Sequence, residues 1–508
     1  MRSVAIAFLL GLGFFGALHA LEPRLADYDG YFHVRYASLG PGEWLGREFR
    51  WMPYSVFADG RWVDHQWLFH ALIWPFTLVL PLLAAAKASG AVFAASMLAA
   101  FAWLLADRGA ARPALWALAL LGASRFFDDR MLMPRTQSLS LAFLFVGLAL
   151  AFRGRARAVG LVAVLFAWTY HVSVMLVPCA LVAGLAGGAA RGRVKVANLA
   201  PALYAALGIG LAYAAHPQSP HTFSFLWLHA VEKVLNPSGQ AVGAEWLPVD
   251  TQTWLLHMAP LLALGAWGAW GAPTGGQGRA AADTRAMALL TAGWIVASAF
   301  SVKWLEYAVP FGVLTLALLW RDGGRSTALL WLGAPLALMH GATVLDHVRG
   351  TVPPADRLQA LASHLPPGEC AVFHADWTDF SELFYWAPQC SYVVGLDPHF
   401  LSGADPLRAT LVEGALAGKV SRLGAMADEK FGAGWVVTTH PAMEAKAAAD
   451  PRLERVYLEE GAGLWRVRAA ETGGDAGGGA LPRNAPPGGQ GPPGPPEALV
   501  MDPDRTAE

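Results

Sequence analysis

Residues 88–106 read ASGAVFAASMLAAFAWLLA, a stretch without a charged side chain. A helix of this length measures about 28 Å at about 1.5 Å per residue, close to the hydrocarbon thickness of a bilayer, about 30 Å. Similar apolar stretches recur along the chain, in which 55% of the residues are hydrophobic and 15% are charged. The sequence therefore predicts an α-helical multi-pass membrane protein surrounded by membrane lipids.

The net charge is close to zero, with 37 Lys and Arg against 38 Asp and Glu. This balance gives no electrostatic basis for binding nucleic acid. The basic residues gather in clusters between the apolar stretches, and the positive-inside rule places such clusters in the cytoplasm. The clusters are Arg108 with Arg112; Arg153 with Arg155 and Arg157; Arg191 with Arg193 and Lys195; Arg279 with Arg285; and Arg321 with Arg325.

Two clusters on one side of the membrane must be separated by an even number of crossings, and most intervals satisfy this condition. We predict about eleven spans in the inner (plasma) membrane, with the N-terminus inside and the C-terminus outside. The predicted spans are residues 1–20, 88–106, 114–127, 136–152, 159–170, 172–189, 197–215, 254–270, 286–302, 304–320 and 327–343.

The beginning of the chain allows alternatives at two places. Residues 1–20 form either an uncleaved span or a signal peptide; Leu18 fits the small-residue rule for cleavage poorly, so we expect an uncleaved span. Residues 67–83 are long enough to cross the membrane, but a crossing there would put Arg108 outside. We therefore expect this segment to lie along the outer leaflet, within a first outer loop of residues 21–87.

After about residue 345 the composition changes to that of a small globular domain. Residues 356–364 have helical spacing, and strands alternating with helical stretches predict an α/β domain. We predict a transmembrane domain over residues 1–345, an extracytoplasmic α/β domain over 346–470 and a disordered Gly- and Pro-rich tail over 471–508. The predicted strands are residues 370–374, 391–394, 435–439 and 464–467.

Two cysteines, Cys370 and Cys390, each stand at the start of a predicted strand, whereas Cys179 lies in a predicted span. If the two strands are parallel neighbours in an oxidising compartment, the two thiols can form a disulfide. Two unpaired structural thiols are an alternative of equal weight.

Charged residues recur in the predicted outer loops. The first loop contains Asp27-Tyr28-Asp29-Gly30-Tyr31-Phe32-His33-Val34-Arg35. The second contains Ser124-Arg125-Phe126-Phe127-Asp128-Asp129-Arg130-Met131-Leu132-Met133-Pro134-Arg135, and the fifth contains Lys303 and Glu306. Carboxylates beside cations at a bilayer surface suit a substrate with a phosphate or pyrophosphate head and an apolar tail.

The acidic residues of these loops are candidate catalytic groups. Asp29 together with Asp128 or Asp129 offers the hard oxygen ligands of a divalent cation such as Mg²⁺ or Mn²⁺, and the cation would neutralise the leaving phosphate. A remaining carboxylate would act as general base or orient the acceptor. The cations expected to hold phosphate oxygens are Arg125, Arg130, Arg135 and Lys303.

The same residues also have structural interpretations. Asp128 and Asp129 can form ion pairs with the flanking arginines and fix an interfacial turn. We expect Asp27 to be a solvated loop residue. The tryptophans of the first outer loop either stack on sugar rings or pack the loop. They are Trp44, Trp51 and Trp62.

The order of these segments resembles the GT-C class of membrane glycosyltransferases, and within it the catalytic subunit of oligosaccharyltransferases. Residues 29–35 are similar to that family's first-loop segment, in which an Asp precedes an aromatic pair, a His or Asn, and an Arg. The resemblance implies that Asp29 faces the metal and the acceptor, and that His33 and Arg35 bind substrate. Residues 124–129 are similar to the second-loop segment with the metal-binding acids, although the family's Asp-x-Asp spacing is absent. This match assigns the metal to Asp128 or Asp129.

Residues 376–380, Asp-Trp-Thr-Asp-Phe, distantly resemble the Trp-Trp-Asp-Tyr-Gly motif with which that family recognises its acceptor. The match implies that Trp377 and Asp379 bind the acceptor, without implying an Asn sequon. Glu306 is a weak counterpart of the family's Ser/Thr-x-x-Glu element.

The resemblance implies a glycosyltransferase that moves a sugar or oligosaccharide from a polyprenyl pyrophosphate or phosphate donor to a protein, lipid or glycan acceptor on the outer face. A second possibility is a transferase that uses a polyprenyl monophosphate sugar to modify a lipid or glycan, which a metal-free site with one essential Asp would favour. A third is a non-enzymatic transporter of lipid-linked glycans. The chain shows no internal repeat, although transporters commonly carry one.

Overall fold

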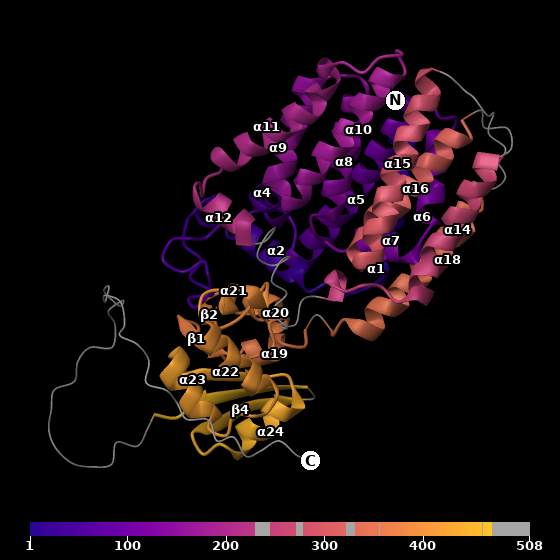
Figure 1. Cartoon of the computed structure of the whole chain (residues 1–508). Helices are drawn as coiled ribbons and strands as arrows, with labels where there is room; N and C mark the ends of the chain where they lie inside the picture. Colours follow the sequence, from indigo (N-terminus) through magenta and orange to yellow (C-terminus); the bar gives the residue numbers. More distant parts are fainter. Residues whose placement is uncertain (229–243, 271–277, 322–330, 355, 460, 470–508) are drawn as a thin grey trace, which may run out of the picture. The chain divides into compact units, whose positions relative to one another are not determined.

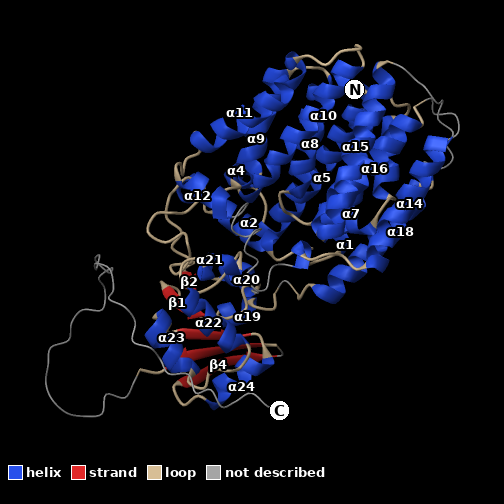
Figure 2. Cartoon of the chain, in the orientation of Figure 1, coloured by secondary structure: helices blue, strands red, loops and turns tan. Residues whose placement is uncertain are grey.

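A computed structural model of the chain describes residues 1–228, 244–270, 278–321, 331–354, 356–459 and 461–469. Helices form the chain as far as residue 351, and a small α/β domain follows (Figure 1; Figure 2). Both belong to one unit that extends from Met1 to Arg468. The predicted disordered tail, residues 471–508, lies outside the described residues.

Apolar helices dominate the first part of the chain, as predicted. Among the described residues, five helices are long and apolar enough to cross a membrane, or six if one bent pair counts as a span. Shorter helices fall below that length, so the number of about eleven spans stays a prediction. The helices of this bundle are α1 (Arg2–Leu21), α5 (Leu82–Asp107), α6 (Pro113–Leu121), α8 (Gln137–Phe152), α9 (Ala156–Thr169), α10 (Leu176–Ala189), α11 (Ala200–Ala214), α14 (Thr251–Trp270), α15 (Arg279–Phe300), α16 (Leu305–Leu319) and α18 (Gly333–Thr351).

Small residues allow these helices to approach closely, as is common in membranes. Helix α9 packs on α11, where an added Cβ at Gly160 would lie 3.1 Å from the carbonyl oxygen of Tyr204. Helix α1 packs on α5, where a Cβ at Gly11 would lie 2.8 Å from Cα of Ala95. Short elements connect the long helices. They are α7 (Arg125–Leu132), α12 (His221–Trp227), η1 (His171–Met175), η2 (Val196–Leu199), η4 (Ala244–Trp246) and η5 (Val302–Trp304).

The predicted span of residues 114–127 is wrong, because two helices cover it. Helix α6 ends at Leu121, where a Cβ at Gly122 would lie 2.7 Å from the carbonyl oxygen of Gly333 in α18. Helix α7 then begins anew with Ser124 as its N-cap, whose side chain accepts a backbone hydrogen bond. The chain therefore turns close to the aspartates that follow.

A second break separates α7 from α8, whose axes differ by 107°. Met133 is extended, with φ −61° and ψ 127°, as is favoured before a proline. Pro134 lacks the N–H that a continuing helix needs. Arg135 therefore lies in a non-helical corner, where its side chain can leave the helix bundle.

The predicted first outer loop, residues 21–87, contains α2 (Asp29–Ser38), α3 (Pro41–Trp44) and α4 (Trp67–Thr77). Helix α4 packs on α2 and α5 and ends at Thr77, inside the segment 67–83 that we expect on the membrane surface. Helix α5 begins directly after Pro81. The loop is thus mostly structured, and α2 lies between the membrane helices and the C-terminal domain, where it packs on α20 (Asp379–Trp386).

An aromatic core fixes this loop to the C-terminal domain. It includes Phe32, Trp51 and Phe384, and the Trp51 ring lies 5.0 Å from that of Phe384. The Trp51 Nε1–H donates a hydrogen bond to the Pro388 carbonyl at 2.7 Å. The loop tryptophans are buried in this core, which confirms the packing interpretation. Their exposed fractions are 4% for Trp44, 1% for Trp51 and 3% for Trp62.

The C-terminal domain is an α/β domain around one five-stranded sheet of order β2-β1-β3-β5-β4. Strands β2, β1 and β3 are parallel, and β5 and β4 are antiparallel to their neighbours. The four predicted strands are confirmed. Strand β4 is missed because charged residues interrupt its apolar pattern at the sheet edge. The elements are α19 (Gln359–Ala362), β1 (Cys370–Phe373), β2 (Cys390–Tyr392), α21 (Pro398–Ser402), α22 (Pro406–Leu416), α23 (Leu423–Phe431), β3 (Trp435–Thr438), α24 (Pro441–Ala449), β4 (Leu453–Glu459) and β5 (Ala462–Val467).

Cys370 and Cys390 are paired directly across β1 and β2, and a disulfide joins them with a Cα–Cα distance of 4.4 Å. Of the two alternatives for these thiols, the disulfide is therefore the one that the structure contains. Cys179 is a buried free thiol.

Candidate functional site

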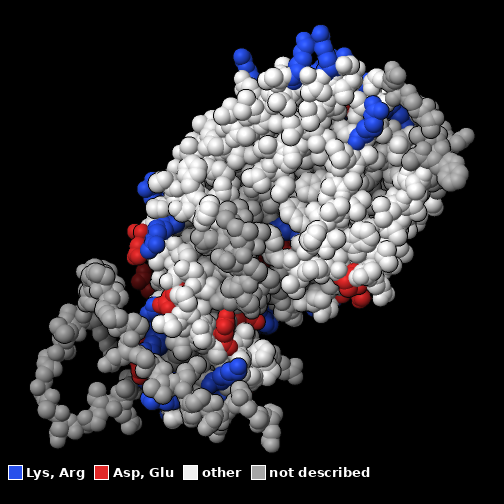
Figure 3. Space-filling view, in the orientation of Figure 1, with Lys and Arg blue, Asp and Glu red and all other residues white. Residues whose placement is uncertain are grey.

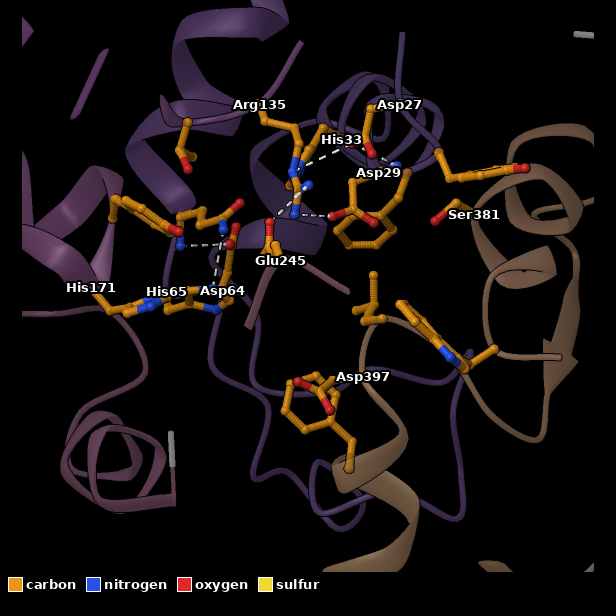
Figure 4. Close-up of a pocket in the computed structure, with 18 of the residues that line it drawn as sticks. Asp27, Asp29, His33, Asp64, His65, Arg135, His171, Glu245, Ser381 and Asp397 are labelled. Carbon is orange, nitrogen blue, oxygen red and sulfur yellow. Dashed lines mark hydrogen bonds and ion pairs between the residues drawn. The ribbon is translucent and has the colours of Figure 1, made fainter. Parts of the chain in front are cut away.

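A cavity of about 440 Å³ lies where the first outer loop, the corner before α8, the start of α16 and the C-terminal domain meet. Its lining combines charged groups, such as Asp29, Arg135 and Lys303, with rings, such as Trp377 and Phe400. Figure 4 shows the charged side chains converging from several elements. A cavity of this size can hold a sugar with its phosphate.

Three carboxylates converge on Arg135 (Figure 4). The Nη2 atom lies 2.6 Å from Oδ2 of Asp29, the Nε atom 3.4 Å from Oδ2 of Asp27, and the Nη1 atom 3.7 Å from Oε2 of Glu245. The Asp27 side chain also accepts a hydrogen bond from the Asp29 backbone N–H at 3.1 Å, at the start of α2. All three guanidinium nitrogens therefore face carboxylates.

Glu245 extends this network to two further cations. Its Oε2 lies 2.9 Å from Nη2 of Arg130, and its Oε1 lies 3.4 Å from Nζ of Lys303. Arg130 also donates from Nε to Glu306 at 3.0 Å. The Lys303 side chain is only 3% exposed, and its Nζ lies 4.5 Å from the Trp246 ring centre. Alternating charges of this kind hold the cations in fixed positions at the cavity wall.

The surroundings of Asp27 and Glu245 shift the pKa values of these two carboxylates in opposite directions. Burial raises the pKa of Asp27 to about 7, although Arg135 opposes the shift. Burial alone would also raise the pKa of Glu245, but Lys303, Arg130 and Arg135 together hold it well below its usual range. Glu245 is therefore an anion at neutral pH, whereas Asp27 is partly protonated.

A chain of hydrogen bonds forms another part of the wall. Nδ1 of His33 lies 3.0 Å from Nε2 of His70, and Nδ1 of His70 lies 2.7 Å from Oδ2 of Asp64. All three residues line the cavity, and their exposed fractions are 6%, 1% and 2%. Burial, followed by His70, lowers the pKa of His33 well below its usual range, so His33 is neutral at pH 7.

Of the site residues predicted from the sequence, five line the cavity: Asp29, His33, Arg135, Lys303 and Trp377. Arg130 stands one step behind it, through its ion pair with Glu245.

Two other predicted residues have structural partners instead of lining the cavity: Arg35 connects α2 to the C-terminal domain, and Asp379 is paired with Arg357 and Thr439. Arg35 donates from Nε to the Tyr385 carbonyl at 2.8 Å and lies 5.1 Å from that ring centre. Asp379 is 2% exposed, pairs with Arg357 at 2.8 Å and accepts a hydrogen bond from Thr439. Burial raises the pKa of Asp379 to about 6. Both residues therefore have structural partners.

The remaining predicted residues, Arg125, Asp128 and Asp129, lie on α7 and are not among those that line the cavity. Asp128 is fully buried, and its nearest ionic partner is His340 of α18, at 3.8 Å. Across the described residues, no three His, Cys, Asp or Glu side chains are grouped so as to hold a metal ion. The residues therefore do not fit the predicted cation shared by Asp29 and an acid of α7, because the turn after α6 directs Asp128 towards α18.

Sequence analysis also missed part of this wall. Asp27 is not a solvated loop residue, since its side chain is 15% exposed and paired with Arg135. Glu245 and His70 were assigned no role, because Arg130 and His33, the partners that give them significance, lie far from them in the sequence. Asp64 was assigned no role because its partner His70 had none. The one signal for Glu245 was a carboxylate next to Trp246.

A second cavity, of about 410 Å³, lies at the opposite end of α8. Gln137, at the start of α8, lines the first cavity, and Phe152, at its end, lines the second. A helix of this length separates the two by about 24 Å. On the face drawn in Figure 3, Lys and Arg gather at that far end, and the band between the ends is almost free of charge. The basic lining residues are Arg153, Arg191, Arg193, Lys195 and Arg279.

No protein-family model and no curated protein matches the chain. Several solved structures do. The arabinofuranosyltransferase AftD from Mycobacteria superposes with a TM-score of 0.54 and 16% identity, over 92% of this chain and 40% of AftD. The oligosaccharyltransferase of Archaeoglobus fulgidus, tethered to an acceptor peptide with an NVT sequon, gives 0.54 and 11%, over 92% of this chain and 74% of that one. The same organism's AglB, with an inhibitory peptide and a dolichol-phosphate, gives 0.55 and 12%, over 91% and 74%.

At these identities the likeness concerns the fold. The chain has the fold of GT-C membrane glycosyltransferases, as the sequence resemblance implied. It spans less than half the length of AftD.

Proposed function

We propose that the chain is a membrane glycosyltransferase that moves a sugar from a polyprenyl-linked phosphate donor to an acceptor on the outer face of the membrane. The observation that carries this proposal is the cavity in which Arg135, Lys303 and Asp29 meet within a GT-C fold. Cations fixed beside a carboxylate suit a reaction in which a phosphate leaves and an acceptor must be oriented.

The donor phosphate would bind to Lys303 and Arg135, because both lie in the wall and carry positive charge. The apolar tail would lie among the membrane helices. AglB, similar in fold, has been solved with a dolichol-phosphate, a long-chain lipid phosphate, and this supports the donor class.

Asp29 would orient the reacting hydroxyl groups. Its side chain is 26% exposed and lines the cavity, and Arg135 is paired with its Oδ2. Trp377 and Phe400 of the C-terminal domain offer rings for a sugar to stack on. An acceptor held between α2 and this domain would attack the anomeric carbon in line, and a single displacement would invert it.

A donor with a single phosphate is the form that the charges favour. The cations Arg130, Arg135 and Lys303 face the carboxylates Asp29, Glu245 and Glu306, with Asp27 partly protonated. A pyrophosphate would need further positive charge, and the residues present do not fit a divalent cation. We therefore derive no step through a metal, and a polyprenyl monophosphate sugar is the better match.

The charge distribution also supports the outer location of the cavity. The basic cavity at the far end of α8 fits the cytoplasmic side by the positive-inside rule (Figure 3). Crossing along α8 then puts Asp29 and the C-terminal domain on the outer side.

The test is sugar transfer in membranes from cells that express the wild type or Asp29→Ala and are fed radiolabelled glucose. Product is sorted into protein, lipid and free glycan. Label that depends on Asp29 would support a transferase, and the labelled fraction would identify the class of acceptor. Equal labelling with both proteins folded and inserted would refute the site and favour a non-enzymatic transporter.

A further inference from the structure

The strongest unassigned feature is the buried chain of Asp64, His70 and His33, which ends at the cavity that holds Asp29. Resting on the proposed function, we infer that this chain is a proton relay: His33 takes the proton from an acceptor hydroxyl, and His70 and Asp64 position and stabilise it. The acceptor group is therefore a hydroxyl.

The hydrogen bonds fix which ring nitrogens carry hydrogen. Asp64 as a carboxylate only accepts, so Nδ1 of His70 must donate to it at 2.7 Å. Nε2 of a neutral His70 then has a lone pair, and Nδ1 of His33 must donate to it at 3.0 Å. The unprotonated Nε2 of His33 remains, since the hydrogen bond of this ring to His70 uses the other nitrogen, Nδ1. The relay thus presents a base to the cavity.

Neighbouring groups hold the relay in one geometry. Asp64 accepts a second hydrogen bond from the Gln66 backbone N–H at 3.1 Å, and its own N–H donates to Oε1 of Gln218 at 3.1 Å. The His33 ring meets the Phe69 ring edge-on at 5.1 Å. A purely structural role for the two histidines and the aspartate would not require His33, the last residue of the chain, to line a cavity.

The step balances without a co-reactant. The acceptor oxygen forms a bond to the anomeric carbon with an electron pair, while the bond from that carbon to the phosphate oxygen breaks and the phosphate leaves with its pair. The hydroxyl proton passes to Nε2 of His33. The Nδ1 proton of His33 passes to His70, which becomes an imidazolium beside Asp64, and the relay returns one proton to water before the next cycle.

The charges around the relay favour this direction. Arg135 and His65 face His33 and disfavour a second proton on it, whereas Tyr36 and His216 lie near Asp64. A proton accepted at the cavity can pass one ring deeper, to His70 beside the carboxylate of Asp64. Because His33, His70 and Asp64 are buried, bulk water does not compete with the acceptor hydroxyl as the source of the proton.

Transfer kinetics test the relay in membranes that hold the full chain, with radiolabelled glucose feeding as before. We expect His33→Gln to lower the transfer rate about 100-fold or more at an unchanged level of labelled donor, and imidazole in the buffer to restore part of the rate. Asp64→Asn should lower the rate and move the acid limb of the pH profile to lower pH, because the imidazolium loses its counter-charge. His221→Gln, a histidine outside the cavity, is the matched control and should transfer at the wild-type rate.

Two results would contradict the relay. Wild-type transfer by His33→Gln, or a slow Asp64→Asn enzyme with an unmoved acid limb, would overturn the relay and leave a structural ion pair. An absence of transfer by the wild type would contradict the proposed function, and it would leave the relay to be tested in another way. In that case, nuclear magnetic resonance of the full chain with isotope-labelled histidine shows which ring nitrogens carry hydrogen. Hydrogen on Nδ1 of both rings supports the relay, and hydrogen on Nε2 of His33 at neutral pH refutes it.

Discussion

The acidic pair Asp27 and Asp29 and the acidic pair Asp128 and Asp129 look alike in sequence, because each stands between an apolar stretch and an arginine. Their environments in the fold are opposite. Asp29 is 26% exposed at the cavity, 2.6 Å from Arg135, whereas Asp128 is completely buried, with an imidazole 3.8 Å away as its nearest ionic partner. The first pair belongs to the cavity wall and the second to the packing of α7 against α18.

The difference shows that an arginine nearby in sequence does not mark a substrate-facing carboxylate. Arg130, next to Asp129, turns away from it and binds Glu245 and Glu306. Arg135 comes from a corner between two helices and reaches Asp29, which is far away in sequence. The two acidic pairs therefore differ in their access to the cavity and not in their local sequence.

The largest effect should follow from Asp29→Ala. We expect transfer to fall about 1000-fold, because the carboxylate that orients the hydroxyl groups is lost and Arg135 loses its nearest partner. Initial rates with radiolabelled donor check this, with the level of inserted protein as the control. A variant that retains a tenth of the wild-type rate would put Asp29 outside the reaction.

Arg135→Lys should lower transfer about 100-fold. A lysine carries the charge, but it cannot offer three nitrogens to Asp27, Asp29 and Glu245 at once. The rate and the KM for the donor are measured together. Arg125→Lys is the matched control on α7, and equal losses in both variants would erase the distinction between the two acidic pairs.

Asp27→Asn tests the raised proton affinity within the first pair. The pKa of Asp27 is about 7 in the fold against an ordinary 3.8, so its contribution to stability is full at low pH and is lost as pH rises through that interval. We expect the wild-type Tm to fall between pH 4 and pH 7. Asp27→Asn should fall less over the same interval, by about 2–4 °C. Thermal unfolding in detergent at both pH values gives the difference, and parallel curves for the two proteins would contradict it.

The smallest effect should follow from Asp128→Asn, since the amide replaces a buried carboxyl of the same size. We expect transfer within about threefold of the wild type and an unchanged or higher Tm. Addition of EDTA should likewise leave wild-type transfer within about threefold, because the residues present do not fit a shared cation. Strong inhibition by EDTA, reversed by Mg²⁺ or Mn²⁺, would restore the metal site predicted from the sequence.

Much of the fold follows from the sequence because period and composition are local. Apolar length predicts α5 and α8, and alternation with helical stretches predicts the parallel strands β1, β2 and β3. Strand β4 and the break at Gly122 were missed for physical reasons. Strand β4 is an edge strand whose sequence contains charged residues, and the break at Gly122 depends on the close approach of α18.

The site was predictable only in part. Asp29, His33 and Lys303 stand out as polar residues beside apolar stretches, and all three line the cavity. Glu245 and His70 do not stand out, since their significance arises from partners far along the chain. The metal hypothesis depended on joining Asp29 to an acid of α7, a contact that no local pattern can predict.

Gly30 has no polar side chain, yet its position beside Pro134 bears on how variants of this chain will behave. A Cβ at this position would overlap Cγ of Pro134, whose ring cannot swing aside. Even Gly30→Ala would therefore push the corner that carries Arg135 away from α2. In a saturation scan scored by transfer, we expect residue 30 to be as intolerant of substitution as residue 29. Positions that do not tolerate substitution will therefore include residues that do not touch a substrate.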